Sequence, residues 1–180
     1  MKADLKKEIE LLEGVTIELN GSTLKVKGPK GEVERNFMHP KIKIISDSNK
    51  ITLSSDKSTK REKMVLGSFE SHIKNMLVGV NESHTYKLKI CSGHFPMNVT
   101  VSGNEFIIKN FLGESVPRKV NLIEGTKVKV DGTEIVVTSP SKEKAGQMAA
   151  KIETLCRITN RDTRIFQDGC YIIHKSGKDM

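Results

Sequence analysis

The chain repeats itself: two stretches of its sequence match when one is shifted by 82 positions. Residues 15–32 (VTIELNGSTLKVKGPKGE) then fall on residues 97–114 (MNVTVSGNEFIIKNFLGE), with apolar residues meeting apolar residues along both runs. Further along, a shift of 84 positions places Met64 on Met148. Two copies are too few for a solenoid, which buries its core by stacking at least three repeats. The repeat therefore predicts two sister domains.

Each copy begins with a series of short segments in which polar and apolar residues alternate, as in residues 16–19 (TIEL). This period of two is typical of half-buried strands. Asn20-Gly21, between the first two segments, is a strong hairpin signal because both residue types accept a positive φ. The expected strands are residues 16–19, 23–27, 42–44 and 50–53 in the first copy and 86–91, 97–101, 105–110, 115–120, 126–130 and 134–138 in the second.

A helix is expected to close each copy, because apolar residues recur at helical spacing over about residues 60–78 and 141–156. Another short helix is expected at residues 4–12, with Leu5 and Ile9 on one face. Strands followed by a helix predict an α+β fold. We expect two tandem sister domains, each a mainly antiparallel sheet with one helix packed on a face. Their expected bounds are residues 1–82 and 83–180, the second with a short C-terminal extension.

The chain is basic, with a formal net charge of +8 and an isoelectric point near 9.4. Excess positive charge favours an anionic partner, either nucleic acid or a membrane surface, and ordinary surface lysines are the alternative explanation. No stretch approaches the roughly 18–20 apolar residues of a transmembrane helix, so we expect no membrane partner. Three widely spaced cysteines, Cys91, Cys156 and Cys170, predict reduced thiols in a cytoplasmic protein.

Motifs for catalysis are missing from the sequence. It contains no phosphate-binding GxxxxGK[ST] loop, no GxGxxG and no GxSxG. Cys91 and His94, together with Cys170 and His174, have the residue types of a zinc site, but the two pairs are far apart and neither contains a CxxC. We expect neither an enzyme nor a metal or other cofactor, and no small-molecule substrate.

Basic residues gather near the second expected helix. Arg157, Arg161, Arg164 and Lys175 follow it within 19 residues, and Lys142 and Lys144 stand at its start. A guanidinium group can bind a phosphate through two parallel hydrogen bonds. Asp162 and Asp168 lie among these arginines, and we expect them to orient the guanidinium groups. The pattern predicts one basic edge that binds nucleic acid.

A second candidate for RNA contact is the loop formed by Gly93, His94, Phe95 and Pro96. Its flexible start lets the backbone approach a ribose-phosphate surface, and an imidazole and a phenyl ring are available to stack on bases. Alternatively, the segment is a simple entry to the next strand, with Phe95 packed inward. The sequence leaves both interpretations open.

Five motifs in this order resemble the large-subunit ribosomal protein six family, specifically its eukaryotic branch, known there as large-subunit protein nine. They are VKGPKG (26–31), SHIKNMLVGV (71–80), HFPMNV (94–99), NFLGE (110–114) and DxRxFxDGxY (162–171). The resemblance runs from about Val15 to Ile173. Any one motif is weak evidence, whereas five in order on a duplicated frame are specific.

The resemblance implies a structural, non-enzymatic constituent of the cytosolic large ribosomal subunit. Such proteins bind large-subunit rRNA mainly through the second domain, near the sarcin–ricin loop and the translation-factor site. Carried over by position, the residues expected to face RNA are those of the two candidate surfaces above. The turn at Lys30 would instead contact neighbouring ribosomal proteins or solvent. The alternative function is a non-ribosomal protein-interaction module with two sheet domains.

Overall fold

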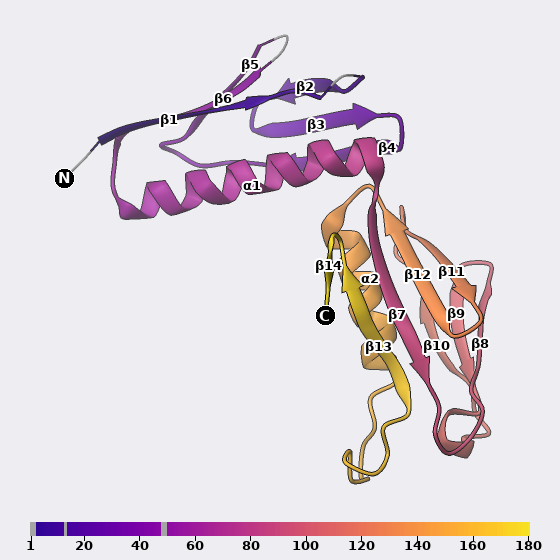
Figure 1. Ribbon diagram of the computed structural model, residues 1–180. Coiled ribbons are helices and arrows are strands. Elements are labelled where there is room, and N and C mark those ends of the chain that lie inside the picture. Colours follow the sequence, from indigo (N-terminus) through magenta and orange to yellow (C-terminus); the bar gives the residue numbers. More distant parts are fainter. Residues whose placement is uncertain (1–2, 13, 48–49) are drawn as a thin grey trace. The chain divides into compact units, whose positions relative to one another are not determined.

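The computed structural model describes residues 3–12, 14–47 and 50–180, which fold into two compact units, Met1–Ser83 and His84–Met180. Both units contain antiparallel sheets and one long helix, so the predicted α+β class is confirmed. Each unit is described by itself (Figure 1).

The first unit has two three-stranded sheets, ordered β1-β6-β5 and β2-β3-β4, and one helix. Residues with alternating polarity form the hairpin of β2 and β3, and Gly21, with φ 63°, makes its turn as expected. The elements are β1 (Ala3–Glu10), β2 (Thr16–Asn20), β3 (Thr23–Gly28), β4 (Gly31–Asn36), β5 (Lys43–Ser46), β6 (Lys50–Ser58) and α1 (Lys60–Glu82).

The second unit repeats this order and then extends it. Sheets β7-β12-β11 and β8-β9-β10 correspond in sequence order to β1-β6-β5 and β2-β3-β4, and α2 corresponds to α1. The extension adds β13 and β14 beside β7, which makes a five-stranded sheet, β11-β12-β7-β13-β14. The elements are β7 (His84–Cys91), β8 (Asn98–Ser102), β9 (Glu105–Lys109), η1 (Phe111–Gly113), β10 (Arg118–Asn121), β11 (Lys127–Asp131), β12 (Glu134–Ser139), α2 (Lys142–Leu155), β13 (Gly169–Lys175) and β14 (Lys178–Asp179).

Each unit has its own apolar core, formed where the helix packs on the strands. In the second unit, Met148 and Ile152 of α2 are buried against Leu88 and Ile135 of the sheet. The repeat is imperfect here: Met64, which the sequence shift aligns with the fully buried Met148, is 64% exposed on α1. The two helices therefore present different residues to their sheets.

The helix expected at residues 4–12 is wrong, because Ala3–Glu10 forms strand β1. Ile9 pairs with Ile51 of β6 and is buried. A spacing of four residues, as between Leu5 and Ile9, puts two side chains on the same face of a helix and also of a strand. The apolar pattern alone could not distinguish the two structures, and pairing with β6 decided between them.

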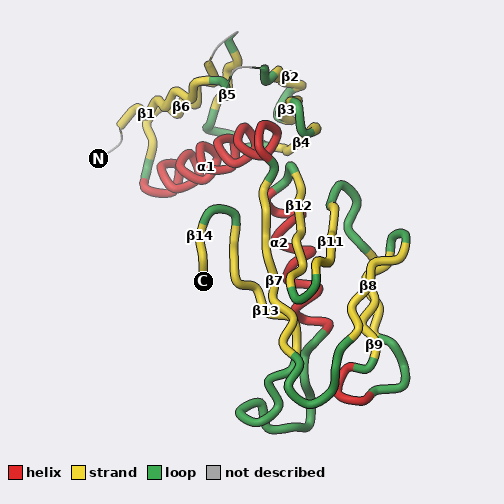
Figure 2. Tube along the Cα trace, turned by 45° about the vertical axis from the view of Figure 1, so that its right-hand side comes forward, coloured by secondary structure: helices red, strands yellow, loops and turns green. Residues whose placement is uncertain are grey.

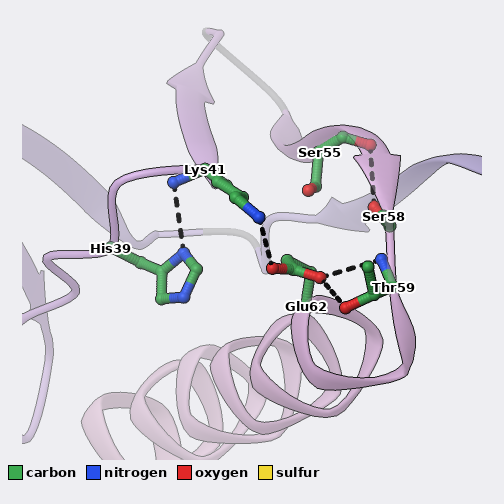
Figure 3. A network of polar contacts seen from close by, with 6 residues as sticks. All are labelled: His39, Lys41, Ser55, Ser58, Thr59 and Glu62. Atoms are coloured by element: carbon green, nitrogen blue, oxygen red, sulfur yellow. Dashed lines mark hydrogen bonds and ion pairs between the residues drawn. The ribbon is translucent and has the colours of Figure 1, made fainter. Parts of the chain in front are cut away.

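Helix α1 begins at a network of polar contacts around the buried Glu62 (Figure 3). Its carboxylate accepts hydrogen bonds from the backbone N–H of Thr59 (2.8 Å) and from the Thr59 hydroxyl. The Lys41 ammonium group donates to the same carboxylate at 2.9 Å. An acidic residue at this position satisfies the N–H of the residue that caps the helix. The network therefore joins the helix start to the chain that leads into β5.

Glu62→Gln is expected to make the protein less stable at neutral pH and its unfolding less sensitive to acid. Hydrogen bonds from Thr59 and then Lys41 lower the pKa of Glu62 from 4.5 to about 2. Because this pKa is lower in the folded state, the ionised carboxylate stabilises the fold above pH 4.5, and that contribution is lost as the pH falls through about 2. Thermal unfolding followed from neutral pH to about pH 2 measures the loss.

The matched control is Glu34→Gln, on the exposed side of β4. It should keep the acid dependence of the wild-type protein. If Glu62→Gln lost stability in acid as steeply as the wild-type chain, Glu62 would not be the group that titrates.

Candidate nucleic-acid interface

Three loops lie together at one end of the second unit (Figure 2). They are the β7–β8 loop (residues 92–97), the segment around η1 (residues 110–117) and the segment between α2 and β13 (residues 156–168). The order of the sheet explains the arrangement, because β13 pairs with β7 and its first residue, Gly169, lies opposite Cys91. We call this group of loops the distal end.

Asp168 joins two of these loops. Its buried carboxylate accepts hydrogen bonds from the backbone N–H groups of Gly93 (2.6 Å) and His94 (3.1 Å) and from Nδ1 of His94 (2.6 Å). Burial raises the pKa of Asp168, but the bonds from His94 and Gly93 outweigh it and hold that pKa below its ordinary value of 3.8. The expectation that Asp168 orients an arginine is wrong, since its partner is the β7–β8 loop.

An imidazole, a phenyl ring and a guanidinium group stack at the distal end. The rings of His94 and Phe166 are 4.6 Å apart and nearly parallel, and the Arg161 guanidinium carbon lies 4.8 Å from the centre of the Phe166 ring. Cation–π contact of this kind holds an exposed arginine in place without neutralising its charge. Arg161 therefore keeps its donors available for an anion.

The neighbouring arginines are also exposed. Asp162 orients Arg164, as expected, through hydrogen bonds to its backbone N–H (2.9 Å) and to Nη2 (2.8 Å). This pairing lowers the pKa of Asp162 and raises that of Arg164. Arg157 lies on the surface just beyond α2. The distal end therefore displays three guanidinium groups on one eight-residue stretch of chain.

The β7–β8 loop is exposed, so the alternative in which Phe95 packs into the core is wrong. Phe95 is 48% exposed, and its ring lies over Gly113, where a Cβ atom would come within 3.6 Å of it. The Asn110 side chain donates to the carbonyl of Pro96 at 3.0 Å, which links the loop to the η1 segment. An apolar ring thus lies at the surface of the distal end.

The structure does not bring the three predicted lysines to the arginines. Lys142 and Lys144 stand in the first turn of α2, whereas Arg157 follows its last turn, and 14 helical residues span about 21 Å. Lys175 pairs with Tyr86, whose hydroxyl lies next to Gly146 near the helix start. The single basic edge predicted from the sequence is therefore two separate groups.

Arg118, the first residue of β10, contacts the distal end, and the sequence did not single it out. Its Nη1 donates to the carbonyl oxygens of Leu155 (2.7 Å) and Arg157 (3.1 Å), and its guanidinium group also binds Glu114 and covers the Phe111 ring. Carbonyl groups at a helix end have no partner within the helix. Arg118 satisfies the carbonyl of Leu155 and so fixes where the segment of residues 156–168 leaves α2.

The residues of the suggested zinc pairs lie in other contacts. His94 binds Asp168, His174 binds Asp179 at 2.6 Å, and Cys170 is buried in the core. Among the described residues, no group of three or more His, Cys, Asp or Glu side chains is placed to hold a metal ion. In the same part of the chain, no helix is both long and apolar enough to cross a membrane.

Comparison with known proteins identifies the family. The family model described as ribosomal protein L6 matches residues 13–83 and again residues 95–169, one match in each unit. The chain belongs to the ribosomal protein L6 family.

Individual L6 relatives match nearly the whole chain. It is 45% identical over 177 residues to the large ribosomal subunit protein uL6 of Methanocella arvoryzae, covering 98% of this chain and 100% of that protein. It is 46% identical over 184 residues to the uL6 protein of Nanoarchaeum equitans, covering 98% and 96%. The uL6 protein of Methanosarcina mazei is 44% identical over 176 residues, covering 98% and 100%. These relatives are archaeal.

Asp168→Ala is expected to lower the free energy of unfolding of this L6-family chain by roughly 1–3 kcal/mol. The change removes the carboxylate that accepts hydrogen bonds from Gly93 and His94. The β7–β8 loop is then no longer held to the start of β13. Urea unfolding measures the loss, and hydrogen exchange at the Gly93 and His94 amides reports the freed loop.

The matched control is Asp162→Ala, which removes an exposed carboxylate from the same segment. It should leave the free energy of unfolding and both amides nearly unchanged. Equal effects of the two substitutions would show that Asp168 does not organise the loop.

Proposed function

We propose that this chain binds large-subunit rRNA through the distal end of its second unit. The observation that carries the proposal is that Arg161 covers the Phe166 ring on which His94 stacks, with Arg157 and Arg164 exposed on the same segment of a unit that matches the L6 family. Arginines neutralise phosphates, and aromatic rings stack on unpaired bases. The chain serves as a structural constituent of the large subunit, with the sheets as rigid supports for these loops.

Electrostatics also favours the second unit. Lys25 and Lys27 on β3 of the first unit lie within ion-pair distance of Glu32 (3.3 Å) and Glu18 (2.8 Å). A lysine beside a carboxylate releases fewer counterions when it meets a phosphate, because its charge is already compensated. Arg161 instead contacts the Phe166 ring, which carries no charge to compensate that of the guanidinium group.

The more specific parts of the proposal come from the motif resemblance. By that resemblance, the rRNA contacts lie near the sarcin–ricin loop and the translation-factor site, and the chain belongs to the eukaryotic branch and to the cytosolic ribosome. Neighbouring ribosomal proteins are proposed as further partners, through the turn at Lys30. The lysine group of Lys142, Lys144 and Lys175 forms a second, smaller contact with RNA.

Arg157→Ala combined with Arg161→Ala is expected to weaken binding to deproteinised large-subunit rRNA and to reduce its salt dependence. Each lost phosphate contact lowers the slope of log K against log salt by roughly one, so the double variant should lose about one to two. Filter binding over a series of salt concentrations measures both quantities.

The control is Lys25→Ala combined with Lys27→Ala, which removes the same charge from the first unit. Its affinity and salt slope should stay close to those of the wild-type chain. A larger loss of affinity in this control than in the arginine variant would contradict the proposal, because it would show that the RNA contact lies on the first unit.

A further inference from the structure

A cavity of about 750 Å³ opens at the distal end, where β7 stops and β13 starts. Residues 91–94 form one side of it, and Ile165, Gln167, Asp168 and Tyr171 form the other. Its size lies within the usual range of small-molecule sites. The L6 match and the arginine cluster leave this cavity without a role.

The walls of the cavity are held in place before anything binds. The Tyr171 hydroxyl donates to the carbonyl of Gln167 at 3.1 Å, and its ring lies over Gly169, where a Cβ atom would come within 3.3 Å of it. His94, on the opposite side, is fixed by Asp168 and by its stack on Phe166. Ile165 adds an aliphatic surface that is 65% exposed. A flat ligand would therefore order few side chains on binding.

The charge of the cavity excludes a phosphate as its occupant. Asp168 supplies a carboxylate, and no lysine or arginine is among the described residues that line the cavity. The N–H groups of Gly93 and His94, which could otherwise cradle an anion, already donate to Asp168. The exposed side chain of Gln167 instead suits an uncharged group that presents N–H donors. Such a group combines a flat apolar face with a polar edge.

The cations lie outside the cavity but close to it. Arg161 covers Phe166, which stacks on His94 in the cavity wall, and Arg164 supplies a carbonyl to the side chain of Gln167 at 3.3 Å. Negative charge is therefore favoured beside the cavity and disfavoured within it. A nucleotide has this distribution, with an uncharged base attached to an anionic backbone.

We infer that the cavity between His94 and Tyr171 receives one unstacked base of the bound RNA, with a flanking phosphate on Arg161. This inference rests on the proposed function and deepens it. Tyr171 and Ile165 contact the faces of the base, and the side-chain carbonyl of Gln167 accepts a hydrogen bond from its edge. Bases with exocyclic amino groups fit better than uracil, because they offer more N–H donors to this acceptor.

The test measures binding of Tyr171→Ala and Ile165→Ala to deproteinised large-subunit rRNA. Loss of base stacking should reduce the affinity of Tyr171→Ala about 5- to 150-fold, with a smaller reduction for Ile165→Ala. The slope of log K against log salt should not change, because no phosphate contact is removed. One base protected from dimethyl sulfate by the wild-type protein should become reactive with Tyr171→Ala.

Two controls separate the base contact from a folding effect. Tyr171→Phe keeps the ring and should keep most of the affinity, and Ile45→Ala makes the change of Ile165→Ala at an exposed position of the first unit. Unchanged binding by both Ile165→Ala and Tyr171→Ala, or a loss accompanied by a lower salt slope, would overturn the inference alone. Failure of the wild-type chain to bind rRNA would overturn the proposed function and this inference with it.

Discussion

The pairing of β13 with β7 holds together everything that distinguishes the second unit from the first. It brings Gly169 opposite Cys91, and thereby sets Asp168 beside the β7–β8 loop, 75 residues away in sequence. The other end of the segment between α2 and β13 is fixed where Arg118 binds the carbonyls of Leu155, the last residue of α2, and of Arg157. With both ends anchored, a segment of irregular chain can display charged side chains in a defined arrangement.

The two units show how a duplicated frame acquires separate roles. Their strands and helices follow the same order, yet the helices begin differently: Glu62 reaches back to Thr59 in α1, whereas the Ser141 side chain accepts from Lys144 in α2. Sequence self-similarity therefore reports the shared sheet topology, which depends on alternation and turns. Contacts that only one copy makes leave no trace in the repeat.

Much of the fold could be predicted because strands and helices have local periods, and the α+β class and the helix that closes each copy followed from them. Strand β13 was not predicted, since the register shifts between Ile172 and His174 and interrupts alternation. The candidate site was predicted only in part. The distance between Lys142 and Arg157 depends on the length of α2, and the partner of Asp168 depends on long-range strand pairing. Neither is a local property of the sequence.

Strand β13 also shields the backbone of β7 from pairing with another chain. In the second unit, β7 lies between β12 and β13. The corresponding strand of the first unit, β1, stands at the edge of its sheet. An edge strand offers unpaired backbone groups to any extended segment, whatever its sequence. The extension that carries the arginines thus covers β7 and moves the edge of the sheet outward to β13, whose last residues pair in turn with β14. The same extension therefore builds the recognition surface and shields a strand that could otherwise pair with another chain.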